Sequence, residues 1–383
     1  MQTGSSALEH LRVLDFSRVL AGPFATMMLA DLGAEVIKVE RPGIGDETRS
    51  WGPPYDATGE STYFQSVNRN KTSVAIDLAS PRGLARARSI AQDCDVVVEN
   101  FRAGVMDRLG LGADELCAAN PRLVYCSVTG FGRHGGADLP GYDLLVQALG
   151  GLMSITGEPD GAPQKVGVAL VDVLAGLFAG VGILSALQYR ERTGHGQRVE
   201  VDLLSSLLAA LTNQGTAYTS GKIVPGRLGN NHPSIAPYEL LECADRELAV
   251  AVGNDRQFRL LCHTVGAPHL AEDTRFATNP VRVAHREALR KELCSLLRRR
   301  PAAEWARDLT SAGVPAGVVN DIAGAFELAT RLGLSPTVDL PRGPHSSVTV
   351  TRNPIGLSLT PPTYRTAPPP LAPPIDRLDP APG

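Results

Sequence analysis

The residue with the clearest chemical potential is Asp172, which interrupts a long apolar run. It is the only charged residue between Lys165 and Arg190. A buried carboxylate is costly unless it is paired, hydrogen-bonded or shifted in pKa. One interpretation is that Asp172 caps a helix that we expect to start at Val173, because Asp is favoured at helix N-caps. The other, compatible with the first, is a nucleophilic carboxylate held at a helix N-terminus in a dry pocket.

Three arginines form a second group of candidates, because each follows a run that predicts a short strand. They are Arg18, Arg41 and Arg102. Sheets of α/β proteins bind ligands beyond the carboxyl ends of their parallel strands, and arginine suits phosphate groups. The turn after the first strand lacks a G-x-G-x-x-G sequence, which disfavours a nicotinamide dinucleotide. The three strands are expected at Leu11–Phe16, Glu35–Val39 and Asp95–Glu99.

The surrounding elements predict an α/β fold with an open, mostly parallel, Rossmann-like sheet. A helix at Pro23–Leu32 separates the first two strands, and such a βαβ unit has parallel strands. Further strands are expected at Thr72–Leu78 and Leu123–Thr129, with a helix from Pro81 to about Gln92 between the strands. Regular alternation of strands and helices places helices on both faces of the sheet.

The helix after Asp172 could also be a membrane span, because Val166–Tyr189 is long enough. The position of Asp172 near one end, several glycines and the lack of a second such segment favour a buried core helix instead. We therefore expect no membrane association. The first ten residues contain neither an apolar core nor a basic cluster, so no signal peptide is expected.

Composition divides the chain into three parts. Residues 1–221 are expected to form the large α/β domain. Residues 222–330 are expected to form a smaller α+β domain, which starts at a segment rich in Gly, Asn and Pro. Residues 331–383 are rich in proline, and we expect them to be extended and to return to the large domain.

Charge and cysteine content exclude some functional classes. The formal net charge of −3 gives no basic footprint, so nucleic acid is not an expected partner. The six cysteines include no C-x-x-C pair and none at metal-ligand spacing with a histidine. We therefore expect reduced thiols, a cytoplasmic location and no metal site.

Several segments together resemble class III CoA-transferases of the CaiB/BaiF type. They share their order and spacing with that family from about Leu11 to Asp321, although each one alone is a weak signal. The most similar members are succinyl-CoA-dependent transferases that activate glutarate or hydroxymethylglutarate. The segments are Val13–Pro23, Asp31–Glu40, Asn68–Ser73, Val98–Arg102, Gly141–Asp143, Asp172 with its helix, Arg192–Gln197 and Gly313–Pro315.

The resemblance implies an assignment for the site. Asp172 matches the catalytic aspartate, and coenzyme A is implied as a thioester substrate, with no permanently bound cofactor. Leu20 stands where formyl-CoA transferase has a glutamine, so a polar role at that position is lost. The residues that match CoA contacts are Arg18, Val19, Leu20, Ala21, Arg41, Ile76, Asp77, Leu78, Ala79, Asn100, Phe101, Arg102, Arg108, Pro140, Gly141, Tyr142 and Asp143.

The implied reaction moves CoA from an acyl-CoA, with succinyl-CoA favoured, to a small carboxylic acid, with a dicarboxylic acid favoured, through an aspartyl covalent intermediate. With a reference pKa of about 3.9, an aspartate is ionised at neutral pH and needs no activating base. A polar loop offers donors suited to the second carboxylate of such an acceptor, although an ordinary linker is the alternative. The acceptor-binding candidates are Arg227, Asn230, His232 and Ser234.

Two other functions stay open. Acyl-CoA racemases resemble this family, but they place a histidine where this chain has Tyr142, and tyrosine is a poor base because its reference pKa is near 10. A CoA-binding protein without catalysis is the other alternative, and Asp172 counts against it. The resemblance also implies an interlocked homodimer, in which each small domain contacts the partner's large domain.

Overall fold

A computed structural model of the protein describes residues 6–373 of the chain, which divides into two compact units. The larger unit contains the residues up to Leu152, the segment Val166–Ile223 and the residues from Ser335 onward. The smaller unit contains Met153–Lys165 and Val224–Leu334. This division differs from the expected domains mainly at Met153–Lys165, which groups with the smaller unit.

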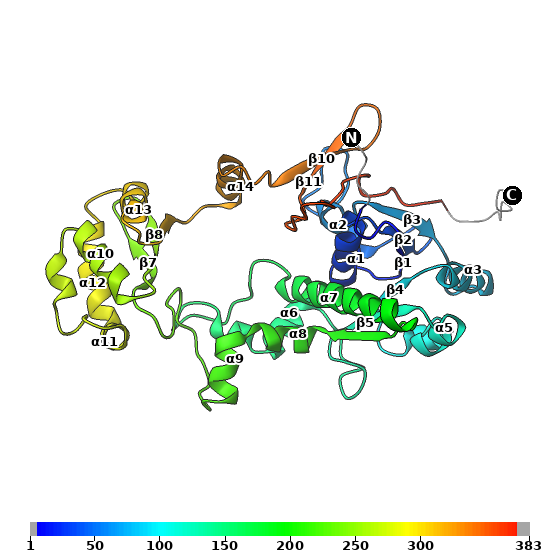
Figure 1. Ribbon diagram of the computed structural model, residues 1–383, viewed down its shortest axis with the longest axis horizontal. Coiled ribbons are helices and arrows are strands. Elements are labelled where there is room, and N and C mark those ends of the chain that lie inside the picture. The colour runs from blue at the N-terminus through cyan, green and yellow to red at the C-terminus, as the bar shows by residue number, and fades with distance from the viewer. Residues whose placement is uncertain (1–5, 374–383) are drawn as a thin grey trace. The chain divides into compact units, whose positions relative to one another are not determined.

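The larger unit is built on a six-stranded parallel sheet with the strand order β3-β2-β1-β4-β5-β6 (Figure 1). The predicted parallel sheet is therefore confirmed. The strand order reverses between β1 and β4, and such a switch point opens a ligand crevice at the carboxyl ends. The strands are β1 Arg12–Asp15, β2 Glu35–Glu40, β3 Lys71–Ala75, β4 Val96–Glu99, β5 Val124–Thr129 and β6 Arg198–Asp202.

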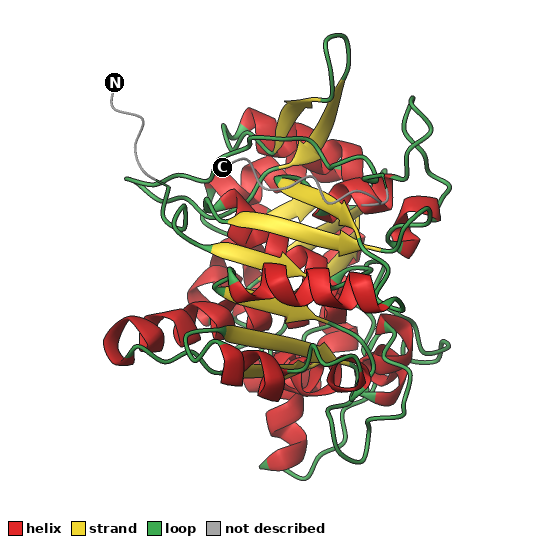
Figure 2. Ribbon diagram, turned by 90° about the vertical axis from the view of Figure 1, so that its right-hand side faces the viewer, coloured by secondary structure: helices red, strands yellow, loops and turns green. Residues whose placement is uncertain are grey.

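Helices cover both faces of this sheet (Figure 2). Alternate residues of its apolar strands point to opposite faces, so each face needs helices to bury it. On β1, Val13 packs with the helices α1, α7 and α8, whereas Leu14 packs with α3, α4 and α5. The helices are α1 Ala21–Asp31, α2 Thr62–Val67, α3 Pro81–Gln92, α4 Val105–Arg108, α5 Ala113–Ala119, α6 Asp143–Leu149, α7 Leu170–Thr193, α8 Leu203–Ala210 and α9 Thr212–Thr219, with 3₁₀ turns η1 Glu47–Ser50 and η2 Leu152–Ile155.

The long helix α7 is largely apolar up to Leu187, apart from Asp172, and it has a buried and an exposed side. It is long and apolar enough to cross a membrane by length and composition alone. Val171, Ala175, Ala179 and Ile183 are nevertheless buried in the core of the larger unit. Its other side leaves large apolar side chains exposed, namely Leu177, Phe178, Val181 and Leu184.

The start of α7 corrects one interpretation of the sequence. The helix begins at Leu170. Its N-cap residue is Ala169, whose side chain makes no capping hydrogen bond. Asp172 therefore lies within the first helical turn and is not the N-cap. The expectation that Asp172 caps a helix from Val173 is wrong, because the capping acceptor comes from a distant part of the chain.

The smaller unit contains an antiparallel sheet, β7-β8-β9, packed against helices. Trp305, Phe258 and Phe276 are the large aromatic residues of its core. The strands are β7 Tyr238–Glu242, β8 Glu247–Ala251 and β9 Ala316–Val318. The helices are α10 Asp255–Thr264, α11 Asn279–Ala284, α12 Arg286–Leu297, α13 Ala302–Ser311 and α14 Ile322–Arg331, with a 3₁₀ turn η3 Pro268–Ala271.

The C-terminal part contains a strand pair that the sequence did not predict, and residues 374–383 lie outside the described part of the chain. It forms an antiparallel hairpin of β10 Thr337–Pro341 and β11 Ser347–Thr351. The chain after the hairpin has no regular structure up to residue 373, and side chains of the larger unit hold it. Asn70 Nδ2 donates to the Thr363 carbonyl at 2.8 Å, and an Arg49 nitrogen donates to the Pro369 carbonyl at 3.0 Å.

Candidate active site

The first turn of α7 is capped by Asp143, which stands at the start of α6. Asp143 Oδ1 accepts the N–H of Val171 at 2.8 Å and the N–H of Asp172 at 3.3 Å. The other carboxylate oxygen accepts from Gln147 Nε2 at 2.5 Å, and Gln147 Oε1 accepts the Val166 N–H at 2.9 Å. Gln147 is fully buried, so these bonds fix Asp143 against the helix that carries Asp172.

This arrangement makes Asp172 more basic than an ordinary aspartate. Burial, and after it the negative charge of Asp143, raises the pKa of Asp172 to about 7. These carboxylates also act on Tyr63 of α2: burial, and after it the charges of Asp172 and Asp143, raises the pKa of Tyr63 to about 12. From the sequence alone, the reference pKa of aspartate was expected for Asp172. The structure instead gives a carboxylate that is only partly ionised at neutral pH.

Asp172 lines a small cavity of about 80 Å³ together with residues that follow β4 and β5. The cavity also contains Ala21, Asn100, Phe101, Arg102 and Gly141. The backbones at Gly130 and Gly141 lie in close contact here: a Cβ on Gly130 would lie 2.4 Å from the Gly141 Cα. Glycine is therefore required at this contact, and it keeps the loop between these two glycines beside Asp172.

The turn from β1 into α1 contributes to this region. Asn100 Nδ2 donates to the Arg18 carbonyl at 2.7 Å, and Asn100 Oδ1 accepts the Arg18 N–H at 2.8 Å. Both the oxygen and the nitrogen of the Asn100 side-chain amide thus hydrogen-bond to the backbone of the turn. Val19, the next residue, has a φ of 67°, which is rare for a branched side chain.

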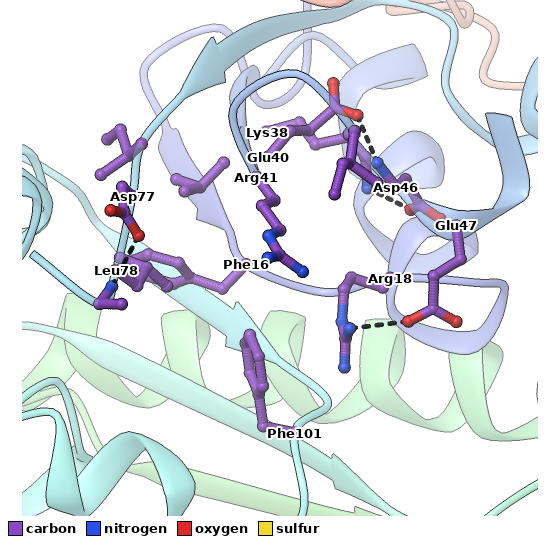
Figure 3. Close-up of a pocket in the computed structure, with 15 residues that line it drawn as sticks. Phe16, Arg18, Lys38, Glu40, Arg41, Asp46, Glu47, Asp77, Leu78 and Phe101 are labelled. Carbon is purple, nitrogen blue, oxygen red and sulfur yellow. Dashed lines mark hydrogen bonds and ion pairs between the residues drawn. The ribbon is translucent and has the colours of Figure 1, made fainter. Parts of the chain in front are cut away.

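A larger cavity of about 310 Å³ lies at the carboxyl ends of β1, β2 and β3 (Figure 3). The guanidinium groups of Arg18 and Arg41 extend into it from different strand ends, and Phe101 lies across from them. Arg18 is held by Glu47 Oε1 at 2.8 Å and lies 4.8 Å from the centre of the Phe101 ring. The other lining residues are Phe16, Lys38, Val39, Glu40, Ile44, Gly45, Asp46, Ile76, Asp77, Leu78 and Ala79.

Beneath this cavity lies a buried network of ion pairs. Lys38 Nζ lies 2.9 Å from Asp46 Oδ2, and Lys71 Nζ lies 3.1 Å from Asp15 Oδ2, with all four side chains inaccessible to solvent. Burial lowers the pKa of Lys71 to about 8, and the positive charge of Lys38 acts in the same direction. Asp46 and Asp15 raise the pKa of Lys38 against the effect of burial. The cavity floor is therefore rigid and charged, although its charges are paired.

The structure brings most of the predicted CoA-contact residues into these two cavities. Arg18, Arg41 and the segment from Ile76 to Ala79 line the larger one, and Phe101 lines both. Asp143 acts on the helix of Asp172, whereas Tyr142 is 58% exposed and Arg108 is on the surface. Val19, Leu20, Arg108, Pro140, Tyr142 and Asp143 are the predicted contacts that line neither cavity.

The four acceptor-binding candidates lie in the smaller unit. Arg227 Nε donates to the Glu158 carbonyl at 3.2 Å, and His232 Nδ1 accepts the Ser234 N–H at 3.1 Å. Asn230 lines a cavity of about 420 Å³ on the β7-β8-β9 sheet. Their relation to Asp172, which belongs to the larger unit, stays a prediction.

Comparison with known proteins identifies the family. The model of CoA-transferase family III matches residues 8–372 of this chain. The chain belongs to CoA-transferase family III. This confirms the expected family, and with it the prediction that the protein is a CoA-transferase.

Relatives support the same conclusion over nearly the whole transferase chain. This chain is 43% identical to a succinate–glutarate CoA-transferase of Agrobacterium fabrum, and the alignment covers 95% of this chain and 92% of that one. An acetyl-CoA:oxalate CoA-transferase of Acetobacter aceti is also 43% identical, covering 84% and 82%. A solved CaiB/BaiF family protein from Brucella suis is 41% identical, with a TM-score of 0.85 and 96% of each chain covered.

Some residues of this transferase site were not predicted from the sequence. Asp46, Glu47 and Ile44 line the larger cavity, but they lie in a loop rich in Gly and Pro that carries no motif. Tyr63 lies on α2, a short helix capped by Ser61, and the charge of Asp172 acts on it. Nothing local in the sequence indicated this neighbourhood.

Proposed function

We propose that this transferase moves CoA from succinyl-CoA to a small dicarboxylic acid, with Asp172 as the covalent nucleophile. The observation that carries the proposal is the pair of cavities that share Phe101. The larger one receives two arginine side chains, which suit the phosphates of CoA, and the smaller one contains Asp172. A CoA molecule that follows both cavities brings its thioester to the carboxylate.

The reaction needs no redox partner and balances within its substrates. The Asp172 carboxylate attacks the thioester carbonyl, so that a mixed anhydride forms and CoA leaves as thiolate. The thiolate then attacks the aspartyl carbonyl, giving an aspartyl-CoA thioester and releasing succinate. The acceptor carboxylate attacks this thioester, and the released thiolate finally attacks the acceptor's acyl carbon, which restores Asp172.

Asp143 supports the attack by Asp172 on the donor thioester in this scheme. The free carboxylate of Asp172 carries a charge that Asp143 repels, whereas acylated Asp172 is neutral. Formation of the acyl-enzyme therefore relieves a like-charge contact, and the raised pKa of Asp172 makes the ionised form a better nucleophile. The backbone N–H groups of the glycine-bearing loop between Gly130 and Gly141 are suited to bind the developing oxyanion.

Residues of the turn and the larger cavity take the CoA-binding roles. We assign phosphate contacts to Arg18 and Arg41, and further CoA contacts to Arg102 and Arg108, which are exposed. Arg18 exchanges its bond to Glu47 for a phosphate when the substrate enters, because a guanidinium binds both groups in the same way. Asn100 holds the turn and does not contact CoA through its side-chain amide.

The acceptor and the assembly complete the proposal. Arg227, Asn230, His232 and Ser234 are assigned to the second carboxylate of the acceptor, and a homodimer brings a smaller unit to each Asp172. The exposed apolar side of α7 supports self-association, because Leu177, Phe178, Val181 and Leu184 gain by being covered. A cytoplasmic enzyme without a permanently bound cofactor is part of the same proposal.

The direct test is a transfer assay with purified protein and succinyl-CoA. Dicarboxylic acids of four to six carbons, oxalate, mesaconate and monocarboxylic acids of equal length are offered, and the acyl-CoA products are measured by mass spectrometry. We expect far higher kcat/KM for a dicarboxylic acid than for its monocarboxylic counterpart, and no product with the Asp172→Asn variant. A preference for fatty or aromatic monocarboxylates contradicts the substrate assignment.

A further inference from the structure

The turn between β1 and α1 has a backbone conformation that needs support. Val19 lies in the left-handed region at a φ of 67°, and its branched side chain disfavours that region. Residues in such conformations persist where the surrounding structure over-determines them, and they gather at functional sites. The question is therefore what holds Val19 there.

Two buried charged side chains bind the backbone on both sides of this turn. Lys38 Nζ donates to the carbonyl of Ser17 at 2.9 Å, two residues before Val19. Asp46 Oδ1 accepts the N–H of Val19 at 3.4 Å. Lys38 and Asp46 also bind each other at 2.9 Å (Figure 3). Together the two side chains therefore form one continuous bridge across the turn.

The bridge is anchored firmly at both ends. Lys38 belongs to β2 and pairs with Asp15 of β1 in the ladder, so the sheet fixes its backbone. Asp46 accepts the N–H of Thr48 at 3.0 Å, and its own N–H binds Glu40 Oε2 at 2.9 Å. The side chains of Lys38 and Asp46 are completely buried. A buried ion pair is weak evidence for stability, because desolvation offsets its attraction. A gain in stability therefore does not by itself explain why Lys38 and Asp46 are paired at this position.

The turn stands between the two cavities of the site. Arg18 lines the larger cavity, together with Lys38 and Asp46, and Ala21 lines the cavity that contains Asp172. A shift of the turn thus moves both the arginine that faces the phosphate side and the wall beside the nucleophile. Misplacement of reacting groups by about 1 Å lowers rates by about a hundredfold.

We propose that Lys38 and Asp46 are positioning residues that hold the turn Ser17–Leu20, with Val19 left-handed, in the conformation that aligns the acyl-CoA thioester with Asp172. The inference rests on the proposed function for its kinetic consequence, but its structural part does not. Neither side chain reacts. Both act through the backbone of the turn.

The test compares Lys38→Met with a matched control in the same unit. Arg69 and Asp31 form another buried ion pair at 2.6 Å, which does not contact the turn. Arg69→Met therefore leaves a buried carboxylate without its cation, as Lys38→Met does. If the single variant Lys38→Met does not fold, the double variant Lys38→Met/Asp46→Asn is measured in its place, because it removes both charges of the pair.

Three measurements on the full chain decide the matter: kcat, the calorimetric Kd for free CoA, and the crystal structure of the variant. We expect kcat to fall by roughly tenfold to a hundredfold in Lys38→Met, whereas the Kd for CoA should rise by a smaller factor, because Arg18 moves with the turn but Arg41 does not. Arg69→Met should lose thermal stability yet keep its kcat. In the crystal, Val19 should leave the left-handed region.

The outcomes separate this inference from the proposed function. An unmoved turn with Val19 still left-handed overturns the inference, whatever the activity. Equal losses of kcat in Lys38→Met and Arg69→Met, in proportion to lost stability, also overturn it and leave only a structural role. A wild-type protein that transfers no CoA refutes the proposed function. A displaced turn in the variant would then still support the positioning role.

Discussion

Replacing Asp143 by asparagine separates its two effects on Asp172. Asparagine keeps an acceptor oxygen for the N–H groups of Val171 and Asp172, so α7 remains capped. It removes the negative charge that helps to raise the pKa of Asp172. Asp143→Asn should therefore lower that pKa while leaving Asp172 in place.

The size of the shift follows from Coulomb's law. Two unit charges about 6–8 Å apart at an effective dielectric constant of about 20 interact by about 2–3 kcal/mol, and about 1.4 kcal/mol corresponds to one pKa unit. These figures correspond to about 1.5–2 units, and because burial is the larger cause of the rise we expect the pKa of Asp172 to fall from about 7 by about 1.5 units. Burial, the larger cause, still keeps it above the reference value.

The assay is the pH profile of kcat/KM for succinyl-CoA between pH 5 and 9. The ionised form of Asp172 is the nucleophile, so activity rises as pH rises through its pKa. The acidic limb of the profile should move to lower pH in Asp143→Asn. The plateau at high pH should fall, because a less basic carboxylate is a weaker nucleophile.

One hydrogen bond must be controlled for. In Asp143→Asn, the amide nitrogen of the introduced side chain would face Gln147 Nε2, which donates to Asp143 Oδ2 in the wild type. The double variant Asp143→Asn/Gln147→Glu restores an acceptor for that amide and for the Val166 N–H. Its acidic limb should lie between those of the wild type and the single variant. An acidic limb that stays at the wild-type pH in Asp143→Asn, with activity retained, would refute the reasoning.

Further predictions concern stability, affinity and assembly. The pKa of Asp172 is raised to about 7 in the folded protein. Ionisation of Asp172 therefore destabilises the fold as the pH rises above the pKa that Asp172 has in the unfolded chain. Asp172→Asn should therefore raise the free energy of unfolding by about 3 kcal/mol more at pH 8.5 than at pH 5. An equal or smaller gain at pH 8.5 in denaturant titrations would contradict this. Arg41→Ala should weaken CoA binding roughly tenfold to a hundredfold by calorimetry, whereas the surface control Arg122→Ala should not. Sedimentation at low micromolar concentration should show a dimer, and a folded monomer there would rule out an obligatory one.

Much of the fold could be predicted because its signals are local. The strands of the large sheet are short apolar runs, and β4 is buried at every position. Ser80 and Pro81 marked the start of α3 correctly, with Ser80 Oγ accepting the Gly83 N–H at 3.0 Å. The β10–β11 hairpin was missed because the prolines nearby suggested an extended segment.

The parts of the site that depend on distant residues could not be predicted. Asp143 caps α7 from 28 residues away, so the sequence around Asp172 suggested the wrong start for the helix. The raised pKa of Asp172 has the same origin, since it depends on burial and on Asp143. Lys38 looked like one polar residue in a strand, and only the folded chain shows that its ammonium group meets Asp46 and the Ser17 carbonyl.

The measurement that tests the account most directly is the covalent state of Asp172 during turnover. Enzyme mixed with succinyl-CoA is quenched with hydroxylamine or borohydride, digested and analysed by mass spectrometry, with Asp172→Asn as the control. The account predicts modification of Asp172 in the wild type and none at that position in the control. Modification at another residue, or rapid turnover without any trapped adduct at Asp172, would contradict it.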